Sequence, residues 1–414
     1  MTVSNDAQSK WPTRQADLLF HDLLLPTETQ QVRRRVREVA EREVAPHATL
    51  IGTREEAVES FPWQPFRALA KHGLFAIPFD AEYGEGLTYR AAATATAVEE
   101  LAYVSSSMAA IYDVHCILAG HALARGSHTL KERWLRPLIA GEVVGAFATT
   151  EPNASSDLST EAIETHAEET AEGFVISGRK RFITNSPVAD FVIVLCRTGT
   201  RLSLILVPLK GTAGVRVGPP DKKLGNRGQL TADVFFDRAP VAREQLVGEL
   251  GQGLRIALAT LTYGRIGIAA AGVGLAQAAF DIAAAHLQKR RAFGKRLGEF
   301  QHWQFKMAER ATEPENARNL YQKAALRLDG GEPFPEPEAA MAKHYGTTLA
   351  VEMARDAVQA LGGYGFLREL GADGTPYRLE EIYRDAKIGE IYEGANEIQK
   401  WIIARTIFGR DVTG

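Results

Sequence analysis

The sequence has very few cysteines: Cys116 and Cys196 are the two among its 414 residues. Both lie in apolar surroundings without metal-ligand spacing, which argues against a disulfide framework or a metal site and fits a reduced compartment. Positive charge is not in excess either, since the formal net charge is −3. A chain without a basic surplus has little with which to neutralise phosphates, so we expect no nucleic-acid partner.

Targeting signals and long apolar runs are also scarce. The first residues, Met1 to Trp11, are polar and lack the apolar core of a secretory signal. We expect no membrane span, because such a span takes about 20 predominantly apolar residues in a row. The sequence therefore predicts a soluble, cytoplasmic protein, and its length allows two or three domains.

Common phosphate-binding glycine patterns are missing as well. The closest candidate, Gly272-Val273-Gly274, lacks the third glycine and lies inside a predicted helix rather than after a strand. Gly294-Lys295 has no upstream glycine at the Walker spacing. If a dinucleotide binds, we expect a binding mode that is not Rossmann-like.

The predicted elements occur in the order helical, β, helical, which gives an α+β multidomain fold class. Residues 1–143 form the predicted N-terminal helical domain, because apolar residues recur there at helical spacing. Residues 144–251 contain short β-branched or aromatic segments separated by turn residues, which predicts a compact antiparallel β domain, a sandwich or barrel. Residues 252–414 return to helical periodicity, typical of a C-terminal helical bundle. The long helical runs there cover 254–287, 299–328 and 337–361.

A short connection near the C-terminus carries the first candidate for chemistry. Glu393 stands between Tyr392 and Gly394, just ahead of a helix predicted to begin close to Ala395. Asn396, followed three residues later by a glutamine, resembles a capping box. A carboxylate on such a connection can reach into a cleft, although a solvated loop acid is the plainer interpretation of this segment alone.

The wider stretch 384–399, RDAKIGEIYEGANEIQ, resembles the C-terminal signature of the acyl-CoA dehydrogenase family. In that family the glutamate of the YEG triplet is the catalytic base, so the resemblance implies that Glu393 is the base. Some members place the base instead at the position held here by Gly264, which glycine cannot serve. The resemblance implies a helical domain, a β domain and a C-terminal four-helix bundle.

Further motifs resemble the same family and appear in its order along the chain. The segment 147–157 is similar to the TEPGAGSD signature, with Asn153 and Ser155 in place of the usual glycines, which puts the shape of that loop in doubt. Four further motifs of the family resemble segments of this chain: 182–185, 261–267, 290–301 and 359–366. Taken singly, each has a plain structural alternative, such as a hydrophilic turn, a core Phe, or charge ending a helix.

The resemblance implies a set of binding residues for non-covalent FAD and an acyl thioester. The implied FAD contacts are Phe147, Thr149, Thr150, Ser156, Phe182, Thr184, Arg290, Phe293, Gln301, Gln359, Gly362, Gly363, Ala395 and Glu397. The implied substrate contacts are Ser156, Thr262, Arg265 and Gly394. Many members carry an acidic residue at the position of Thr262, so the choice between coenzyme A and an acyl carrier protein stays open.

The implied activity is FAD-dependent α,β-dehydrogenation of an acyl-CoA to a trans-2-enoyl thioester, with hydride transfer to flavin N5. The run 264–267 resembles short-chain and branched-chain members. An electron-transferring flavoprotein or similar acceptor and a homotetramer are the implied partners. The alternatives are a flavin oxidase or monooxygenase of the same fold, and a DNA-associated or non-catalytic flavin-binding protein.

Overall fold

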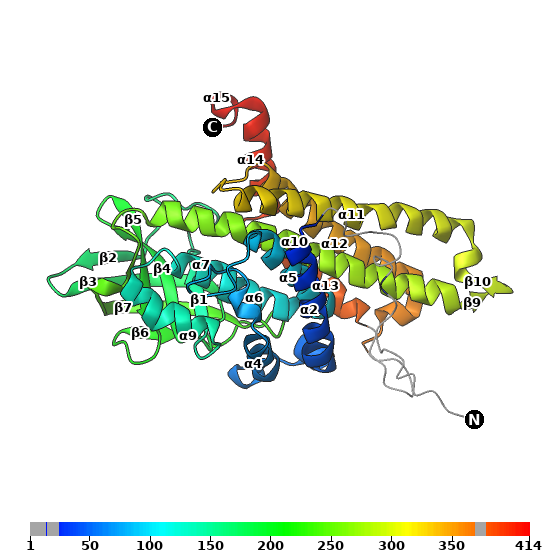
Figure 1. Cartoon of the computed structure of the whole chain (residues 1–414), viewed down its shortest axis with the longest axis horizontal. Helices are drawn as coiled ribbons and strands as arrows, with labels where there is room; N and C mark the ends of the chain where they lie inside the picture. Colours follow the sequence, from blue (N-terminus) through cyan, green and yellow to red (C-terminus); the bar gives the residue numbers. More distant parts are fainter. Residues whose placement is uncertain (1–13, 15–24, 369–377) are drawn as a thin grey trace.

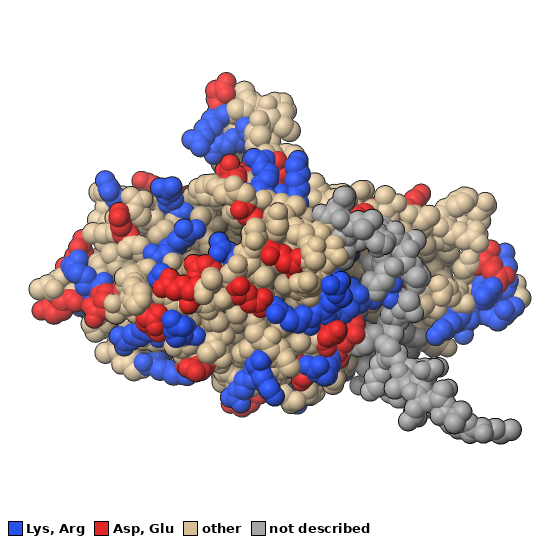
Figure 2. Space-filling model, in the orientation of Figure 1, with Lys and Arg blue, Asp and Glu red and all other residues tan. Residues whose placement is uncertain are grey.

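The computed structural model describes residues 14, 25–368 and 378–414, in which a β-rich end and a helical end are joined along one long axis (Figure 1). The segment from Met1 to Trp11 lies outside the described residues. On the face shown in Figure 2, basic and acidic side chains are intermingled rather than gathered into one field of a single sign.

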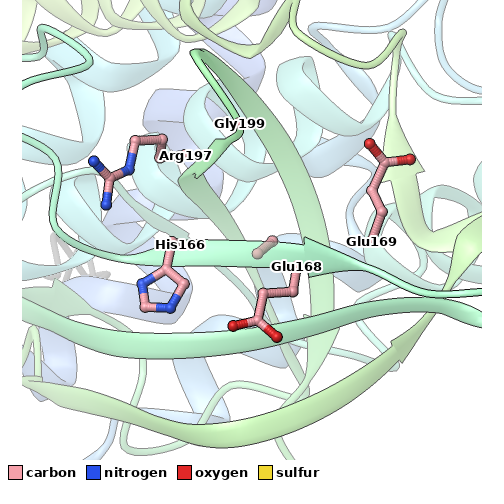
Figure 3. Close-up of a pocket in the computed structure, with 6 residues that line it drawn as sticks. His166, Glu168, Glu169, Arg197 and Gly199 are labelled. Atoms are coloured by element: carbon pink, nitrogen blue, oxygen red, sulfur yellow. The ribbon is translucent and has the colours of Figure 1, made fainter.

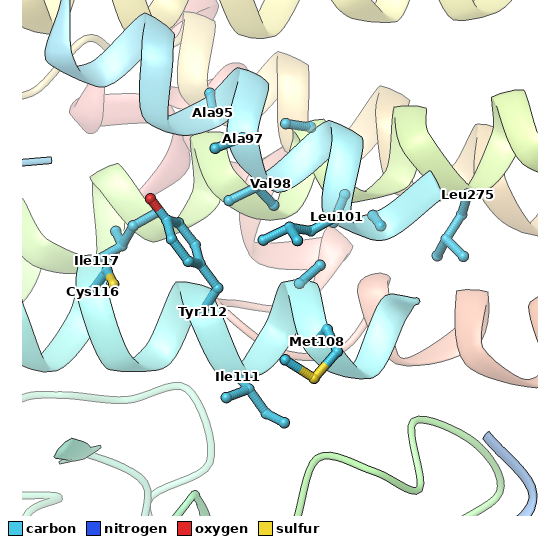
Figure 4. Packing of buried hydrophobic residues seen from close by; sticks show 14 of the residues in the cluster. Ala95, Ala97, Val98, Leu101, Met108, Ile111, Tyr112, Cys116, Ile117 and Leu275 are labelled. Carbon is cyan, nitrogen blue, oxygen red and sulfur yellow. The ribbon is translucent and has the colours of Figure 1, made fainter. Parts of the chain in front are cut away.

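The N-terminal region is helical throughout. It contains a helix without a solvent-facing side, α5, in which nearly every residue is buried, including the charged Glu99 and Glu100. The chain then continues into α6 and the π-helical segment η6, whose Tyr112, Cys116 and Ile117 pack with α5 (Figure 4). The elements are α2 (Thr27–Val39), η2 (Ala40–Val44), η3 (Ala45–His47), α3 (Ala48–Thr53), η4 (Val58–Ser60), α4 (Trp63–Lys71), η5 (Leu74–Ala76), α5 (Arg90–Val104), α6 (Ser106–Tyr112), η6 (Asp113–Gly120), α7 (His121–Leu123), α8 (His128–Leu130), η7 (Lys131–Leu135) and α9 (Arg136–Ile139).

The central region is a single eight-stranded sheet with the order β6-β7-β3-β2-β4-β5-β8, and β1 pairs with β4. The expectation of an antiparallel sheet was partly wrong, because β1 and β2 each pair with β4 in parallel. Parallel pairing needs a long crossover, and the connection from Ala148 to Phe191 provides it. The elements are β1 (Gly145–Ala148), β2 (His166–Glu169), β3 (Gly173–Thr184), β4 (Phe191–Thr198), β5 (Arg201–Pro208), β6 (Val215–Val217), β7 (Thr231–Ala242), η8 (Arg243–Gln245) and β8 (Leu246–Val247).

The C-terminal region is built from the long helices that the sequence periodicity predicts. They are α10 (Gly253–Lys289), α11 (Gln301–Asp329) and α12 (Glu338–Leu361), followed by η10 (Gly362–Phe366) and α13 (Leu379–Gly389). A small hairpin of β9 (Arg291–Ala292) and β10 (Lys295–Arg296), then η9 (Leu297–Glu299), joins α10 to α11. The sequence-based boundaries after residues 143 and 251 fall in the connections between the last helix, the sheet and α10.

Helix α10 is long and apolar enough, by length and composition, to cross a membrane, so the expectation that no such run exists was wrong. However, 94% of its most apolar window is buried inside the protein, as in a core helix. It packs against α5, α11 and α12, and it extends from the sheet to the far end of the bundle (Figure 1). Its glycines allow neighbouring groups to approach its backbone.

The last helices, α14 (Asn396–Phe408) and α15 (Arg410–Thr413), project from the body of the chain (Figure 1). Only Asn396 and Gln399 of α14 are buried. The predicted capping box is wrong: no side chain caps α14, because the Asn396 side chain bonds to α12 and that of Gln399 donates to the Gly394 carbonyl.

Candidate active site

The connection between α13 and α14 holds Glu393 in an unusual backbone conformation. Glu393 has φ +56° and the next residue, Gly394, has φ +86°. A left-handed conformation costs a non-glycine residue about 1–2 kcal/mol, so the surrounding structure must impose it. The backbone turn directs the Glu393 side chain toward α10.

A buried lysine holds this connection in place. Lys343 of α12 is fully buried, and its Nζ donates to the Gly394 carbonyl at 2.9 Å and to Asn396 Oδ1 at 3.0 Å. The Asn396 amide in turn donates to Thr347 Oγ1 and Thr348 Oγ1 at 3.1 and 3.2 Å. These bonds fasten the strained turn to one face of α12.

The Glu393 carboxylate lies over a glycine of α10. A Cβ atom built at Gly264 would stand 2.6 Å from Glu393 Oε2 and 2.8 Å from Leu118 Cδ2, closer than real Cβ atoms approach. Glycine at this position therefore makes the space that the acid occupies. The residue as a whole is half-buried, yet Oε2 is enclosed and has no hydrogen-bond partner among the described residues.

Burial raises the pKa of Glu393 to about 7, while the nearby cations Lys343 and Arg265 hold it from rising further. Burial also lowers the pKa of Lys343 to about 7, an effect that Glu393 opposes. A carboxyl group that titrates near neutrality is suited to accept a proton in a catalytic step. Glu393 thus has both the geometry and the acidity of a general base.

Two residues predicted to contact the substrate sit on the same stretch of α10. Arg265 is buried, and its Nη1 donates to Glu336 Oε1 at 2.7 Å, so its guanidinium already has an ion-pair partner. Thr262 is buried one turn earlier. Of the other predicted residues, Gly394 and Ala395 of the connection are half-buried, while Glu397 in the first turn of α14 is exposed.

A second group of predicted residues gathers where β1 leaves the sheet. Phe147 is buried, Thr149 and Thr150 are half-buried, and Ser156 is exposed. A buried pair fixes the loop: Lys180 Nζ contacts Glu151 Oε1 at 2.7 Å and the Thr149 carbonyl at 3.0 Å.

Asn153 and Ser155 stand in this loop where the family signature has glycines. Ser155 adopts φ +54°, the left-handed conformation that glycine favours. Asn153 instead donates from its side chain to Glu164 Oε1 at 3.1 Å. The loop therefore makes a glycine-like turn with a serine at that position.

Phe182 and Thr184 lie on the less buried face of β3, but the regular alternation of side chains along a strand is interrupted there. The pairing register with β7 shifts between Lys180 and Ile183, and Phe182 has φ +59°. This bulge leaves the Phe182 ring 59% exposed. Thr184 Oγ1 accepts a bond from Gln229 Nε2 at 2.6 Å, so its own hydroxyl proton is directed elsewhere.

The remaining predicted residues lie at the opposite end of α10. They are all exposed: Arg290, Phe293, Gln301, Gln359, Gly362 and Gly363. The Arg290 guanidinium lies 5.3 Å from the centre of the Tyr364 ring, which joins the α10 end to η10. The end of α10 at Lys289 is 25 residues beyond Gly264, roughly 37 Å at 1.5 Å per residue, so this group stands far from Glu393 of the same chain.

Family models and relatives identify the fold. The models for the N-terminal, middle and C-terminal domains of acyl-CoA dehydrogenase match residues 26–142, 146–239 and 251–408. The chain is 37% identical over 392 residues to the short-chain specific acyl-CoA dehydrogenase of Clostridium acetobutylicum, an alignment covering 94% of this chain and 100% of that relative. The chain belongs to the acyl-CoA dehydrogenase family.

Solved structures agree with this assignment. The butyryl-CoA dehydrogenase of Megasphaera elsdenii is similar with a TM-score of 0.85 and 32% identity, covering 92% of this chain and 98% of that one. A glutaryl-CoA dehydrogenase of Mycobacterium smegmatis in complex with FADH2 has the same fold, with a TM-score of 0.86 and 24% identity over 96% of this chain and 98% of that one. The family resemblance and the three-part fold class are therefore confirmed, and this acyl-CoA dehydrogenase is an FAD-dependent oxidoreductase.

The described residues fit such a cofactor. The exposed Phe182 ring in its bulge offers a flat apolar surface, and the Thr184 hydroxyl beside it has a proton to donate. Cβ atoms built at Gly362 and Gly363 would meet nothing within 4 Å, which leaves room for a ligand to approach the backbone there. Arg290 supplies a guanidinium of the kind that binds phosphates in a bidentate manner.

Sequence reasoning missed several residues that shape the site. Lys343 holds the Glu393 turn, and the pair of Lys180 and Glu151 holds the loop after β1. Asp113, at the start of η6, is a buried acid that lies close enough to Glu393 for their charges to interact. For Asp113 and Lys343 the available signal was an isolated charge within a largely apolar run, whereas Lys180 lies between two arginines and Glu151 in a polar loop, where no such signal exists.

A concave region beside β2 and the end of β4 is separate from this site. With a volume of about 460 Å³, it is lined by His166, Glu168 and Glu169 of β2 and by Arg197 and Gly199 around the end of β4 (Figure 3). It contains none of the predicted site residues.

Proposed function

We propose that this protein dehydrogenates a short acyl-CoA thioester to its trans-2-enoyl product, with Glu393 as the base. One observation carries the assignment of the base. The Glu393 carboxylate is held over Gly264 by a strained turn, its Oε2 lacks a partner among the described residues, and its pKa is about 7. An acid with only a structural role would be paired.

The proposed mechanism starts from the thioester carbonyl, which makes the α-proton acidic. The acyl group lies beside the Glu393 carboxylate that occupies the space over Gly264, and the backbone N–H of Glu393 donates to the thioester oxygen. The ionised Glu393 carboxylate then removes the α-proton, and Lys343 and Arg265 help to keep that carboxylate ionised. Phe182 and Thr184 would hold FAD, which when bound would supply the acceptor for the β-hydride.

The test is Glu393→Gln in the holoenzyme, followed by single-turnover mixing with butyryl-CoA. The amide keeps the shape but cannot take the proton, so flavin reduction should slow by ~10²–10⁴-fold. The exposed Glu244, changed to Gln, serves as the matched control and should leave the rate unaltered. Flavin bleaching by Glu393→Gln at the rate of the wild type would refute the assignment.

We also propose that the protein is a homotetramer in which a neighbour completes each FAD site. The separation of roughly 37 Å between Gly264 and the end of α10 supports this, because Arg290 is then better placed to serve another copy. Large apolar side chains are exposed near these elements, among them Phe293 at 93% and Phe366 at 81%. The projecting α14 and α15 add Ile407, Phe408 and Val412.

Arg290→Ala should therefore weaken FAD retention and the oligomer together. Light scattering and the flavin released on denaturation measure the two effects, and Arg243→Ala, at an exposed residue of η8, is the control. A clean monomer that retains FAD tightly would contradict this arrangement.

The remaining partners follow from the family. We propose a cytoplasmic enzyme whose reduced flavin passes its electrons to an electron-transferring flavoprotein or a similar acceptor. Oxygen consumption at the rate of substrate oxidation would instead identify an oxidase. Because Thr262 replaces the acidic residue of many members, the same butyryl group should also be offered on an acyl carrier protein, and the ratio of the two rates identifies the carrier.

A further inference from the structure

Asp113 is a buried acid that the proposed mechanism does not use. It begins the π-helical segment η6 and is 1% exposed. Neither of its carboxylate oxygens has a hydrogen-bond partner among the described residues. Buried polar groups are nearly always paired, and π-helical turns occur often at functional sites, so this acid needs an explanation.

Its position relates it directly to Glu393. A Cβ atom built at Gly267 would collide with Asp113 Oδ1, just as one at Gly264 would collide with Glu393 Oε2. The two glycines are three residues apart on α10 and therefore face the same way, about 4.5 Å apart along the axis. The two carboxyl groups thus lie on one side-chain-free strip of α10, one turn from each other. Ile117, 3.0 Å from the Cβ position of Gly267, supplies an apolar wall.

Among the described residues, the groups that act on the charge of Asp113 include no compensating cation. Tyr112 and Cys116 lie beside it on its own helix, Tyr263 faces it from α10, and Glu393 faces it from the connection before α14. Burial, reinforced by the charge of Glu393, raises the pKa of Asp113 well above its ordinary value. A carboxyl group in this position gains from any donor that a ligand brings.

We propose that Asp113 recognises a hydrogen-bond donor, a hydroxyl or an amine, on the acyl group of the substrate. This inference rests on the proposed function, because Glu393 sets the place of the α carbon. An acyl chain that passes beside the two carboxyl groups, in the direction from Gly264 to Gly267, brings a substituent a few bonds beyond the α carbon against Asp113. A plain hydrocarbon chain would leave the acid buried without a partner.

The test compares three thioesters of similar size with the holoenzyme: pentanoyl-CoA, 4-hydroxybutyryl-CoA and 4-aminobutyryl-CoA. At least one polar substrate should have a kcat/KM about 10–100-fold above that of pentanoyl-CoA. Asp113→Ala should abolish that preference, whereas Asp237→Ala, at an exposed position of β7, should preserve it. Asp113→Asn separates the two donors, since an amide still pairs with a hydroxyl but loses the charge that holds an ammonium.

Binding gives a second readout that does not depend on turnover. Calorimetry with the Glu393→Gln holoenzyme should show the same order of affinities for the three thioesters. If pentanoyl-CoA is turned over and bound as well as both polar substrates, and Asp113→Asn leaves the ratios unchanged, this inference is wrong while the proposed dehydrogenase function stands. This comparison holds even if Asp113→Ala fails to fold. If none of the three thioesters, nor butyryl-CoA, reduces the flavin, the proposed function itself fails.

Discussion

Replacing Lys343 with methionine should change the pH at which the base works. Lys343 Nζ donates to the carbonyl of Gly394, the neighbour of Glu393, and its charge lowers the pKa of Glu393. Methionine fills a similar volume without the charge. The folded protein should survive, because the Gly394 carbonyl keeps its bond from Gln399 Nε2 at 2.8 Å and Asn396 Oδ1 keeps one from Thr347 at 3.3 Å.

The magnitude follows from the charge. A cation within a few ångströms lowers the pKa of a carboxyl by about 1–3 units, and the lower end applies here because Lys343 itself titrates at about 7. The Glu393 pKa should therefore rise from about 7 to about 8 in Lys343→Met. At pH 7 the ionised fraction of the base then falls from about one half to about one tenth, so flavin reduction should be about fivefold slower.

The assay is single-turnover flavin reduction by butyryl-CoA from pH 6 to pH 9.5. The wild-type rate should rise through about pH 7 as Glu393 loses its proton. The rate of Lys343→Met should rise with a midpoint about one pH unit higher and should reach the wild-type rate near pH 9. Lys387→Met, which removes an exposed lysine paired with Glu390, is the control and should leave the midpoint in place. A rate that falls equally at every pH, with the midpoint unmoved, would show that Lys343 acts only by position and would refute the electrostatic argument.

Three further changes give independent measurements. The pKa of Glu393 in the folded protein, about 7, lies above its ordinary value of 4.5, so the stability that Glu393 contributes is fully present below pH 4.5 and is lost as the pH rises through 7. Urea unfolding should therefore show Glu393→Gln gaining stability relative to the wild type between pH 4.5 and pH 7. Gly264→Ala places a Cβ atom 2.6 Å from Glu393 Oε2 and should slow flavin reduction at least ~10-fold while the fold and FAD content persist. Ser155→Gly removes a serine from a left-handed backbone conformation and should raise the free energy of unfolding by up to ~1 kcal/mol, measured as a higher thermal midpoint. An unchanged or lower midpoint would mean that the turn carries no strain.

The sequence predicted those features that depend on local periodicity. The three long helices of the bundle begin and end within a few residues of the predicted runs. The strands were predicted less fully: the sequence indicated only short segments separated by turns, whereas Gly173–Thr184 is one continuous strand, β3, and the pair β1 and β2 was not predicted. Neither short strand shows a clear alternation, and pairing partners far along the chain decide their existence.

The parts of the site that sequence reasoning missed share a physical cause. Lys343 is 51 residues from Gly394 in sequence, and Asp113 meets α10 at Gly267 across a larger gap. Nothing in the neighbourhood of either residue in the sequence indicates what it faces. The capping box failed for the same reason, because Asn396 finds its partners on α12 rather than in its own first turn.

The pattern of satisfied and unsatisfied buried acids separates structure from chemistry in this protein. Glu99 accepts bonds from Arg318 and Tyr321, and Glu151 is bonded by Lys180 and by two backbone amides, so each is an interior charge neutralised by its own fold. Among the described residues, Asp113 is the carboxylate whose two oxygens are both buried without a partner, and Glu393 Oε2 lies one helical turn away in the same condition. A folding protein gains nothing by placing two such groups beside a strained turn on a strip cleared by glycines. The cost is understandable when the missing partners arrive with the substrate, one as an acidic α-proton and the other as a donor on the acyl chain.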